Sequence, residues 1–497
     1  MLKSRILLIL AVTIFVSCKK DDPLIEVLVP GPDQIVYAIN TNNELIRFNA
    51  RTPGTSLSKV PISGIVAGEK LLSIDFRPAT GELYSVSSAS KIYVINQNDG
   101  TSRVIGAGAF TPAISGTIAS IDFNPTVDRI RLVTNTGQNL RLHPETGAVA
   151  ATDGAINGGT SPVITGVAYT NSFAGASTTV LFDIDQASGK LYRQDPPNNG
   201  TLVEIGNLDV SFTGNAAFDI TPDNTALLAV ANAFYTVNLT TGKSSKVGNT
   251  PEALVDIAVP TNPVAYAIDA TNNNLLIFNP SNIAAGVISK SVTGLQALEN
   301  IYGIDFRPLN GQLYALGSTS RLYTINLSSG AATQVGAGTL ATLLTGTDFG
   351  FDFNPTVDRI RVVSNTGQNL RLNPIDGTVA ATDGALNPGV PMVTAAAYTN
   401  SFAGATTTTL FVIDHNNDKL YTQVPPNNGT LVETGNLGIN ITNNNGFDIA
   451  ARSGVAYLLG TVGAVTNLYT LNLTSGASAA PIVFPLTVKG LSIGTGF

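Results

Sequence analysis

The sequence is poor in the side chains that most often carry enzyme chemistry. A single cysteine, Cys18, occurs in 497 residues, which excludes an intrachain disulfide and a cysteine-based metal site. Histidine occurs only twice, at His143 and His415, so the usual nitrogen ligands of zinc are scarce. No P-loop, dinucleotide fingerprint, G-x-S-x-G or H-E-x-x-H motif is present. We therefore expect no catalytic residues and no cofactor.

Charge is also scarce. Charged residues make up 12% of the chain, the formal net charge is −7, and no basic stripe occurs anywhere. Proteins that bind nucleic acid concentrate Lys and Arg on one face, so nucleic acid is excluded as a partner. The 48 glycines and 26 prolines lie between periodic apolar stretches, which indicates a folded chain with many turns.

The N-terminus reads as a targeting segment. A positively charged start precedes an apolar run at residues 6–16, which is too short to span a bilayer. The run ends in Phe15-Val16-Ser17-Cys18, which resembles a bacterial lipobox. We expect residues 1–17 to be a lipoprotein signal peptide and residues 18–34 to be an acylated Cys18 followed by a tether. The alternative is an ordinary secretory signal with a chance cysteine.

Lys19-Lys20-Asp21-Asp22 follows the predicted lipidation site. A lysine and paired acids at this place resemble the surface-export signal of lipoproteins from one Gram-negative phylum. The alternative is a merely solvated tether. We expect an outer membrane lipoprotein, held to the membrane by its acyl chains and exposed at the cell surface.

The rest of the chain is one unit repeated twice. Residues 121–157 match residues 351–387 at 29 of 37 positions, with an offset of 230. Other blocks recur in the same order, so we divide the chain into unit 1 at 35–260 and unit 2 at 261–497. Within each unit, strand-like segments of four to seven residues alternate with turns such as NDG, SSG and PNNG.

Four such segments recur every 40 to 50 residues, which is typical of a β-propeller blade. A phrase such as SIDFRP at Ser73 marks the inner strand of each blade and occurs five times per unit. Unit 1 begins with a second strand and ends with an inner strand, so its two ends can complete one blade. The sequence predicts an all-β fold with two tandem five-bladed rings; one continuous ten-bladed ring is the alternative.

The blocks IDFRPATGELY, FNPTVDRIRLVTNTGQNLRL and AYTNSFAGA resemble the bacterial family designated domain of unknown function 4394 (DUF4394). The resemblance covers both units, which is nearly all of the chain after the signal peptide. It implies a secreted or cell-surface propeller. It implies no activity, substrate or catalytic residue.

Three groups of polar residues are candidate sites. The first is an arginine and amide group on a predicted hairpin, in two copies, suited to a carboxylate, a phosphate or sugar hydroxyls. Its members are Arg131, Asn135, Gln138 and Asn139, with Arg361, Asn365, Gln368 and Asn369. Because neighbouring blades cover both faces of a blade, buried arginines would instead need acid partners, for which Asp128 and Asp153 are at hand. The amide-rich loops Asn135–Asn139 and Pro196–Gly200 would otherwise be simple turns.

The second group comprises the aspartates of the inner strands. They are Asp75, Asp122, Asp219 and Asp256 in unit 1 and Asp305, Asp352 and Asp448 in unit 2. A collar of carboxylates around an axis could hold Ca²⁺ or supply the acid and base of glycoside hydrolysis. The favoured interpretation is that each aspartate accepts backbone N–H bonds and joins neighbouring blades.

The third group comprises Asp-rich turns at Asp183–Gly189 and Asp414–Asp418, which lack the twelve-residue calcium loop and read as strand connections. We expect no metal. For the whole protein we expect a non-catalytic binding or adhesion module for a surface polysaccharide or a protein. A glycosidase-like enzyme and a purely structural scaffold are the alternatives, because propellers host all three functions.

Overall fold

The computed structural model describes residues 28–497, so Cys18 and the predicted signal peptide lie outside the described residues. Residues 28–497 form ten four-stranded antiparallel sheets and three short 3-10 turns, without an α-helix. The all-β prediction is confirmed. Over the same range, no helix is long and apolar enough to cross a membrane.

Five sheets come from unit 1, each given in the order in which its strands pair. They are β20 (Asp256–Ala258), β1 (Ile35–Ile39), β2 (Glu44–Asn49) and β3 (Ser56–Pro61); β4 (Leu71–Phe76), β5 (Leu83–Ser87), β6 (Ile92–Ile95) and β7 (Ser102–Ile105); β8 (Ala119–Asn124), β9 (Arg129–Thr134), β10 (Asn139–Leu142) and β11 (Val149–Thr152); β12 (Ile164–Tyr169), β13 (Leu181–Asp185), β14 (Lys190–Gln194) and β15 (Leu202–Asn207); and β16 (Ala216–Ile220), β17 (Ala226–Val230), β18 (Ala233–Val237) and β19 (Ser244–Asn249).

Unit 2 repeats this arrangement. Its sheets are β40 (Val488–Ile493), β21 (Ala265–Asp269), β22 (Leu275–Phe278) and β23 (Val287–Lys290); β24 (Ile301–Arg307), β25 (Gln312–Gly317), β26 (Arg321–Ile325) and β27 (Ala332–Val335); β28 (Phe349–Asn354), β29 (Arg359–Ser364), β30 (Asn369–Leu372) and β31 (Val379–Thr382); β32 (Val393–Tyr398), β33 (Leu410–Asp414), β34 (Lys419–Gln423) and β35 (Leu431–Asn436); and β36 (Asn445–Ile449), β37 (Ala456–Val462), β38 (Val465–Leu471) and β39 (Ile482–Phe484). The 3-10 turns are η1 (Pro197–Asn199), η2 (Ile283–Ala285) and η3 (Pro426–Asn428).

The two ends of each unit share a sheet. The last strand of unit 1, β20, pairs antiparallel with β1, and the last strand of unit 2, β40, pairs antiparallel with β21. The first strands of successive sheets also contact one another in order, and β20 contacts both β16 and β4. In unit 2, β40 contacts both β36 and β24 in the same way. The predicted union of the N-terminal and C-terminal strands in one sheet is confirmed.

Apolar side chains fill the space between neighbouring sheets. Strand alternation sends every second side chain to the same face, where it meets the next sheet. Aromatic pairs recur at these contacts in edge-to-face geometry, at ring distances of 5.1 Å for both Tyr84–Phe123 and its unit 2 counterpart Tyr314–Phe353. These pairs fix the spacing of the sheets, and thus the positions of the loops at their ends.

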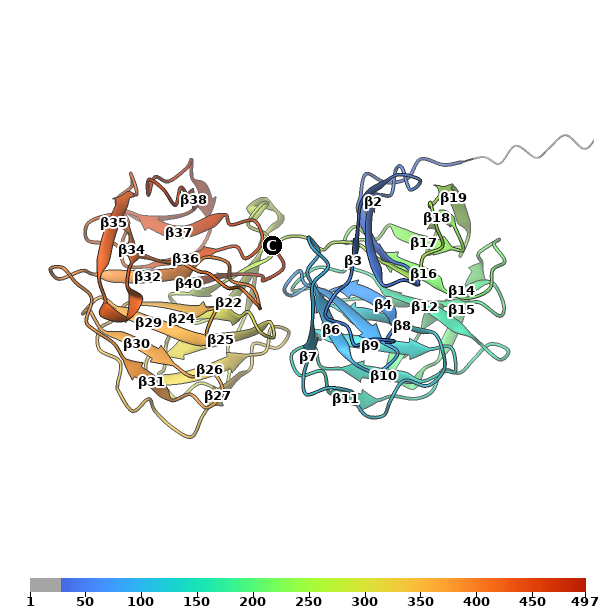
Figure 1. The fold of residues 1–497 in the computed structure, drawn as a ribbon, viewed down its shortest axis with the longest axis horizontal. Helices are drawn as coiled ribbons and strands as arrows, with labels where there is room; N and C mark the ends of the chain where they lie inside the picture. The colour runs from blue at the N-terminus through green and yellow to red at the C-terminus, as the bar shows by residue number, and fades with distance from the viewer. Residues whose placement is uncertain (1–27) are drawn as a thin grey trace, which may run out of the picture.

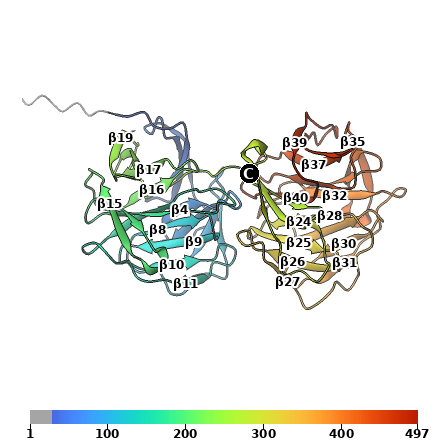
Figure 2. The same ribbon diagram turned by 180° about the vertical axis from the view of Figure 1, so that it is seen from behind.

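The two units lie side by side, and the C-terminus is placed between them (Figures 1 and 2). Hydrogen bonds cross the junction from Gly496 N–H to Thr80 O (2.8 Å) and from the Tyr266 hydroxyl to Ala79 O (2.9 Å). Ala79 of unit 1 is part of an apolar cluster whose other buried members all come from unit 2. The turn between β4 and β5 therefore packs against unit 2, and the junction is a packed interface.

Candidate functional site

The fold brings the predicted arginine and amide residues together. The guanidinium of each central arginine, however, is already hydrogen-bonded to other side chains of the protein. Arg131 is 2% exposed. Its Nη1 donates to Asn139 Oδ1 (2.7 Å) and Asp153 Oδ2 (2.6 Å), and its Nη2 donates to Asn198 Oδ1 (2.8 Å). Arg361 repeats these contacts with Asn369, Asp383 and Asn427. The loops at 135–139 and 196–200 thus meet around a buried ion pair.

Of the two acids that the sequence offered as partners, Asp153 binds Arg131 and Asp128 does not. Asp153 also binds Arg141 through both carboxylate oxygens, at 2.8 and 2.9 Å. Burial opposes ionisation, but the hydrogen bonds from Arg141 and Arg131 prevail and lower the pKa of Asp153. The expectation that Asp128 is an acid partner of the hairpin arginines is wrong, because its carboxylate pairs with Arg77 of the preceding sheet.

The predicted amide residues hold their own loops in shape. Gln138 Nε2 donates to Ala113 O (2.8 Å) and its Oε1 accepts the Ser115 N–H (2.9 Å); Gln368 makes the equivalent pair of bonds. Asn139 donates to Gly154 O and Pro197 O, both at 3.0 Å. Asn135 and Asn365 accept backbone N–H bonds from Thr117 and Thr347. Ligand binding by these side chains stays a prediction.

The inner-strand aspartates join neighbouring sheets through the backbone. Asp75 accepts the N–H of Phe123 on the next sheet (2.7 Å) as well as that of Phe76 (2.7 Å). Asp219 in the same way accepts the N–H groups of Val259 and Ile220, both at 2.6 Å. In unit 2, Asp305 bonds to Phe353 and Asp448 to Ile493. These contacts agree with the interpretation favoured from the sequence.

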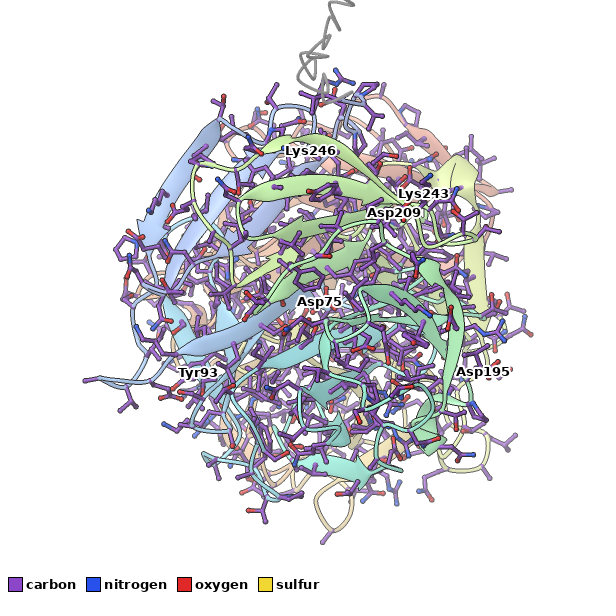
Figure 3. The ribbon with its side chains drawn as sticks, turned by 90° about the vertical axis from the view of Figure 1, so that its right-hand side faces the viewer. Asp75, Tyr93, Asp195, Asp209, Lys243 and Lys246 are labelled. Atoms are coloured by element: carbon purple, nitrogen blue, oxygen red, sulfur yellow. The ribbon has the colours of Figure 1, made fainter. Side chains whose placement is uncertain are left out.

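Three of these carboxylates meet in each unit. Asp75, Asp122 and Asp219 place carboxylate oxygens within 4.8 Å of one another, and Asp305, Asp352 and Asp448 do the same. Asp75 lies near the middle of unit 1 seen along the long axis of the molecule, and the exposed Asp195 lies at its edge (Figure 3). Oxygen atoms at this spacing are of the type that Ca²⁺ binds. The backbone N–H bonds already occupy some of their lone pairs.

Burial governs the protonation of these acids. It raises the pKa of Asp219 and of Asp305 to about 7, against the opposing effect of their backbone hydrogen bonds. Asp256 does not belong to the three carboxylates that meet in unit 1, here called the aspartate triad of that unit, and burial raises its pKa to about 8. Its carboxylate accepts the Ile74 N–H (3.0 Å) and the Ser73 hydroxyl. Protons are held here at pH values where exposed carboxyls are ionised.

The Asp-rich turns are strand connections. Asp185 Oδ1 accepts the N–H groups of Val163 (2.8 Å) and Ala187 (3.0 Å), and its Oδ2 accepts the Ser188 hydroxyl (2.6 Å). Asp414 accepts the Asn416 N–H (3.0 Å) in the same manner. These are side-chain turns in which aspartate replaces a backbone acceptor.

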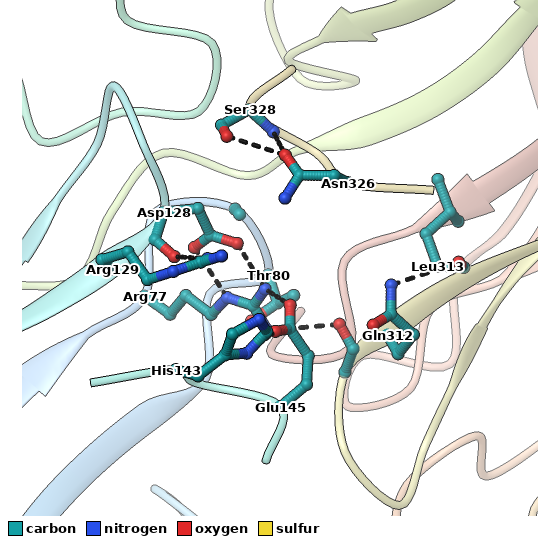
Figure 4. Close-up of polar contacts among 12 residues, drawn as sticks. Arg77, Thr80, Asp128, Arg129, His143, Glu145, Gln312, Leu313, Asn326 and Ser328 are labelled. Carbon is teal, nitrogen blue, oxygen red and sulfur yellow. Dashed lines mark hydrogen bonds and ion pairs between the residues drawn. The ribbon is translucent and has the colours of Figure 1, made fainter. Parts of the chain in front are cut away.

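A buried ionic network, which the sequence did not reveal, borders the junction (Figure 4). Arg77 is 0% exposed and binds Asp128 (2.9 and 2.5 Å), Glu145, and Gly311 O of unit 2 (3.2 Å). Burial of Glu145 opposes ionisation, but the Arg77 charge prevails and lowers the pKa of Glu145 to about 2. The acid partner lies 68 positions along the chain, so no local spacing pointed to it.

Three clefts lie along the same junction, and each is lined by residues of both units. Their volumes are about 560, 460 and 450 Å³. The first is lined by Tyr37, Arg47 and Gln97 of unit 1 and by Phe497 of unit 2. Sequence reasoning missed these clefts because they form only where the two repeats dock. The available signal was the segment YTNSFAGA, which occurs at residues 169–176 and again at 398–405. The second copy lines the second cleft and the first copy lines the third.

The second cleft contains an arginine without a counter-ion. Arg452, in the turn between β36 and β37, places its guanidinium carbon 5.1 Å from the centre of the Phe402 ring. Among residues 28–497, no hydrogen bond or ion pair is found for its side chain. Burial lowers the pKa of Arg452, while the nearby charge of Glu82 acts the other way. The guanidinium is thus available to an anion entering from solvent.

Comparison with known proteins gives three kinds of likeness: to a named protein, to solved structures and to a family. The chain is 27% identical over 527 residues to a protein named Outer membrane protein A of Rickettsia rickettsii, a match that covers 94% of this chain and 22% of that protein. The chain therefore spans about a fifth of the length of this curated relative.

Two solved structures from B. thetaiotaomicron also match, both of the extracellular domain of one protein, described as a one-component and as a hybrid two-component system. Each is 11% identical, and the match covers 91% of this chain and 65% of theirs, with TM-scores of 0.27 and 0.26. At these scores the likeness carries no argument.

The family comparison matches the two units one by one. The model of the family described as Domain of unknown function (DUF4394) matches residues 44–258 and residues 274–492. One match falls in each unit, in agreement with the internal repeat and with the two sets of five sheets. The chain therefore belongs to the DUF4394 family and carries two tandem copies of its domain.

Proposed function

We propose that this protein is a membrane-anchored, non-catalytic binding module that holds its ligand at the junction between its two units. The observation that carries the proposal is the position of the three clefts, each lined by both units and within the size range of about 300–1,000 Å³ typical of ligand sites. A fixed junction keeps a binding surface in one shape, which lowers the entropy lost on binding.

The scaffold of this module is a pair of five-bladed β-propellers. The pairing of β20 with β1 and of β40 with β21 supports closure of each unit on itself. The contacts of β20 with β4 and of β40 with β24 support two five-bladed rings over a single ten-bladed ring. A ring without free edges presents only loops and axial mouths to a partner.

The anchor is a lipid on Cys18, and the protein is displayed at the outer membrane. The lipobox-like segment and the acidic tether motivate this location, and the name of the Rickettsia relative is in keeping with it. Replacing Cys18 with Ala should move the protein from the membrane fraction to the soluble fraction. Continued sedimentation of Cys18→Ala with membranes would contradict lipidation, and protection of the parent protein from protease on intact cells would contradict surface display.

The environment of the central aspartates argues against a glycosidase role. The aspartates of each triad are buried, and each triad member accepts a backbone N–H from a neighbouring sheet. A glycosidase needs one carboxyl group on either side of a scissile bond in an accessible cleft. The acids here are committed to holding sheets together.

The test is an array of glycans and peptides probed with residues 28–497. A ligand that binds in the 560 Å³ cleft should be lost in Asn262→Trp, because Asn262 lines that cleft. A ligand that binds in the 460 Å³ cleft should be lost in Ser102→Trp. Asn42→Trp, at an exposed turn outside all three clefts, is the matched control. Cleavage of an arrayed glycan, or binding that survives both cleft substitutions, would overturn the proposal.

A further inference from the structure

The second cleft holds a partly buried arginine without a carboxylate partner, unlike the fully buried arginines among residues 28–497. The buried guanidiniums of Arg77, Arg131 and Arg361 each bind a carboxylate of the chain. Arg452 is half-buried and stacks on Phe402 without such a partner. Holding a guanidinium away from water without a counter-ion is unfavourable, so a bound anion would relieve this cost.

Within residues 28–497 no neighbouring carboxylate forms an ion pair with this guanidinium, although the charges of Glu82 and Asp99 favour its charged form. Arg103 Nη2 binds Glu82 of the same unit at 2.8 Å, so these two charges neutralise one another, and Arg103 Nε donates across the junction to Leu309 O of unit 2 at 3.1 Å. Asp99 lies at the exposed rim, where its Oδ1 accepts the Thr101 N–H and hydroxyl. The cleft therefore offers one open cation and, at its edge, one carboxylate able to accept hydrogen bonds.

We propose, on the basis of the binding function above, that the cleft between residues 94–103 of unit 1 and residues 402–404 of unit 2 binds an acidic sugar through its carboxylate, with Arg452 as counter-ion. A guanidinium recognises a carboxylate through two parallel N–H bonds. The hydroxyl groups of the sugar donate to Asp99, and its apolar C–H face lies against Phe402 and the half-exposed Leu309. A peptide carboxylate would use the arginine but would bring no row of hydroxyls to Asp99.

The two units differ at this place, so the site occurs once in the described residues 28–497. The segment AFDITPD at 217–223 is the counterpart of GFDIAAR at 446–452, which sets Asp223 in the position of Arg452. Asp223 lines the first cleft and carries the opposite charge. We therefore expect one acidic sugar per chain.

The experiment is isothermal titration of residues 28–497 with tetrasaccharides of galacturonate, mannuronate and glucuronate. The neutral analogues, in which each carboxyl is reduced to a hydroxymethyl group, are titrated in parallel, and inorganic sulfate serves as a plain anion. We expect at least one acidic tetrasaccharide to bind with a stoichiometry of one, its neutral analogue to bind at least tenfold more weakly, and sulfate to compete poorly.

Two substitutions connect such binding to the cleft. Arg452→Ala should weaken binding at least tenfold, whereas Arg51→Ala, at an exposed arginine paired with Asp33, should leave it unchanged. Asp99→Asn, at an exposed side chain, should weaken the sugar but not sulfate, and it serves if Arg452→Ala does not fold. Failure of all three acidic tetrasaccharides, equal binding of the neutral analogue, or full binding by Arg452→Ala overturns this inference. If the array still yields a ligand that Asn262→Trp abolishes, the proposed function stands and only the acidic sugar fails.

Discussion

Asp183 and Val412 occupy equivalent positions in the two units, yet one is a carboxylate and the other a hydrocarbon. Asp183 on β13 lies opposite Val167 and Tyr192, and Val412 on β33 lies opposite Ala396 and Tyr421. Both side chains are 0% exposed. Neither carboxylate oxygen of Asp183 has a hydrogen-bond partner within residues 28–497. Burial raises the pKa of Asp183 well above its ordinary value, with Arg131 acting in the opposite direction.

Replacing Asp183 with Val should therefore stabilise unit 1. A buried polar group without a hydrogen bond costs about 1–3 kcal/mol, and the valine shape already fits this place in unit 2. We expect the free energy of unfolding to rise by about that amount in urea titrations at pH 7. The reverse substitution, Val412→Asp, should destabilise unit 2 to a similar degree. A less stable Asp183→Val would show that the carboxyl has an essential partner.

Stability should fall as the pH rises from about 4.5 to about 8. The folded-state pKa values of Asp219 and Asp305, about 7, and of Asp256, about 8, exceed the ordinary value of 3.8. The folded protein thus binds protons that the unfolded chain has released, and this stabilisation is lost as the pH rises through the folded values. We expect a loss on the order of a few kcal/mol between pH 5 and pH 8.

Denaturant titrations at both pH values measure this loss. Asp219→Asn should flatten the profile, because an amide keeps an acceptor oxygen and does not ionise. Asp195→Asn, at an exposed side chain, should leave the profile unchanged. Below pH 4.5 the trend reverses, because Glu145 has its pKa lowered to about 2 and its ion pair is lost on protonation. Stability that rises steadily from pH 5 to pH 8 would contradict the assignment of protonated central acids.

The secondary structure and the order of the strands could be predicted from the sequence because both follow local rules. The phrase SIDFRP alternates apolar and polar residues with a period of two, and the observed β4 covers Leu71–Phe76. The 230-residue repeat then located the matching strand of unit 2. The union of β20 with β1 followed from counting strands at the two ends of a unit.

The candidate site was less accessible to sequence reasoning because it depends on distant contacts. Asp128 sits beside Arg129 in the chain, yet its carboxylate binds Arg77, 51 positions away. Strand alternation gives the face of a side chain but not which neighbour covers that face. The unpaired Arg452 was invisible for the same reason: only docking of the two units forms the cleft around it.

The ionic network at Arg77 should contribute more to stability than its copy in unit 2. Arg77 is 0% exposed and binds both Asp128 and Glu145, whereas Arg307 binds Asp358 at a half-buried place. Removing one partner of a buried ion pair leaves the other charge uncompensated, at a cost of about 3–5 kcal/mol.

We expect Arg77→Met to lose about that amount and Arg307→Met to lose less, because the Asp358 partner of Arg307 is 29% exposed and no second acid binds Arg307 among residues 28–497. Thermal and urea unfolding of the two variants measure the difference. Equal losses would show that burial does not set the strength of this network.

The close approach of Gly81 to Phe497 should decide whether the junction stays closed. Gly81 has a left-handed backbone with φ of +75°, and a Cβ atom added to it would overlap the Phe497 ring. Gly454 has a similar φ of +68° but open space around it, so Gly454→Ala isolates the backbone strain, about 1–2 kcal/mol.

Gly81→Ala should lose more than this control, because it also displaces Phe497, and with it the bond from Gly496 N–H to Thr80 O. Since Phe497 lines the 560 Å³ cleft, a ligand bound there should be lost as well. Small-angle scattering should report a larger radius of gyration for Gly81→Ala than for Gly454→Ala, and limited proteolysis should cut faster near residues 260–264. Equal stability, radius and proteolysis in the two variants would mean that the two units hold together without the Phe497 contact.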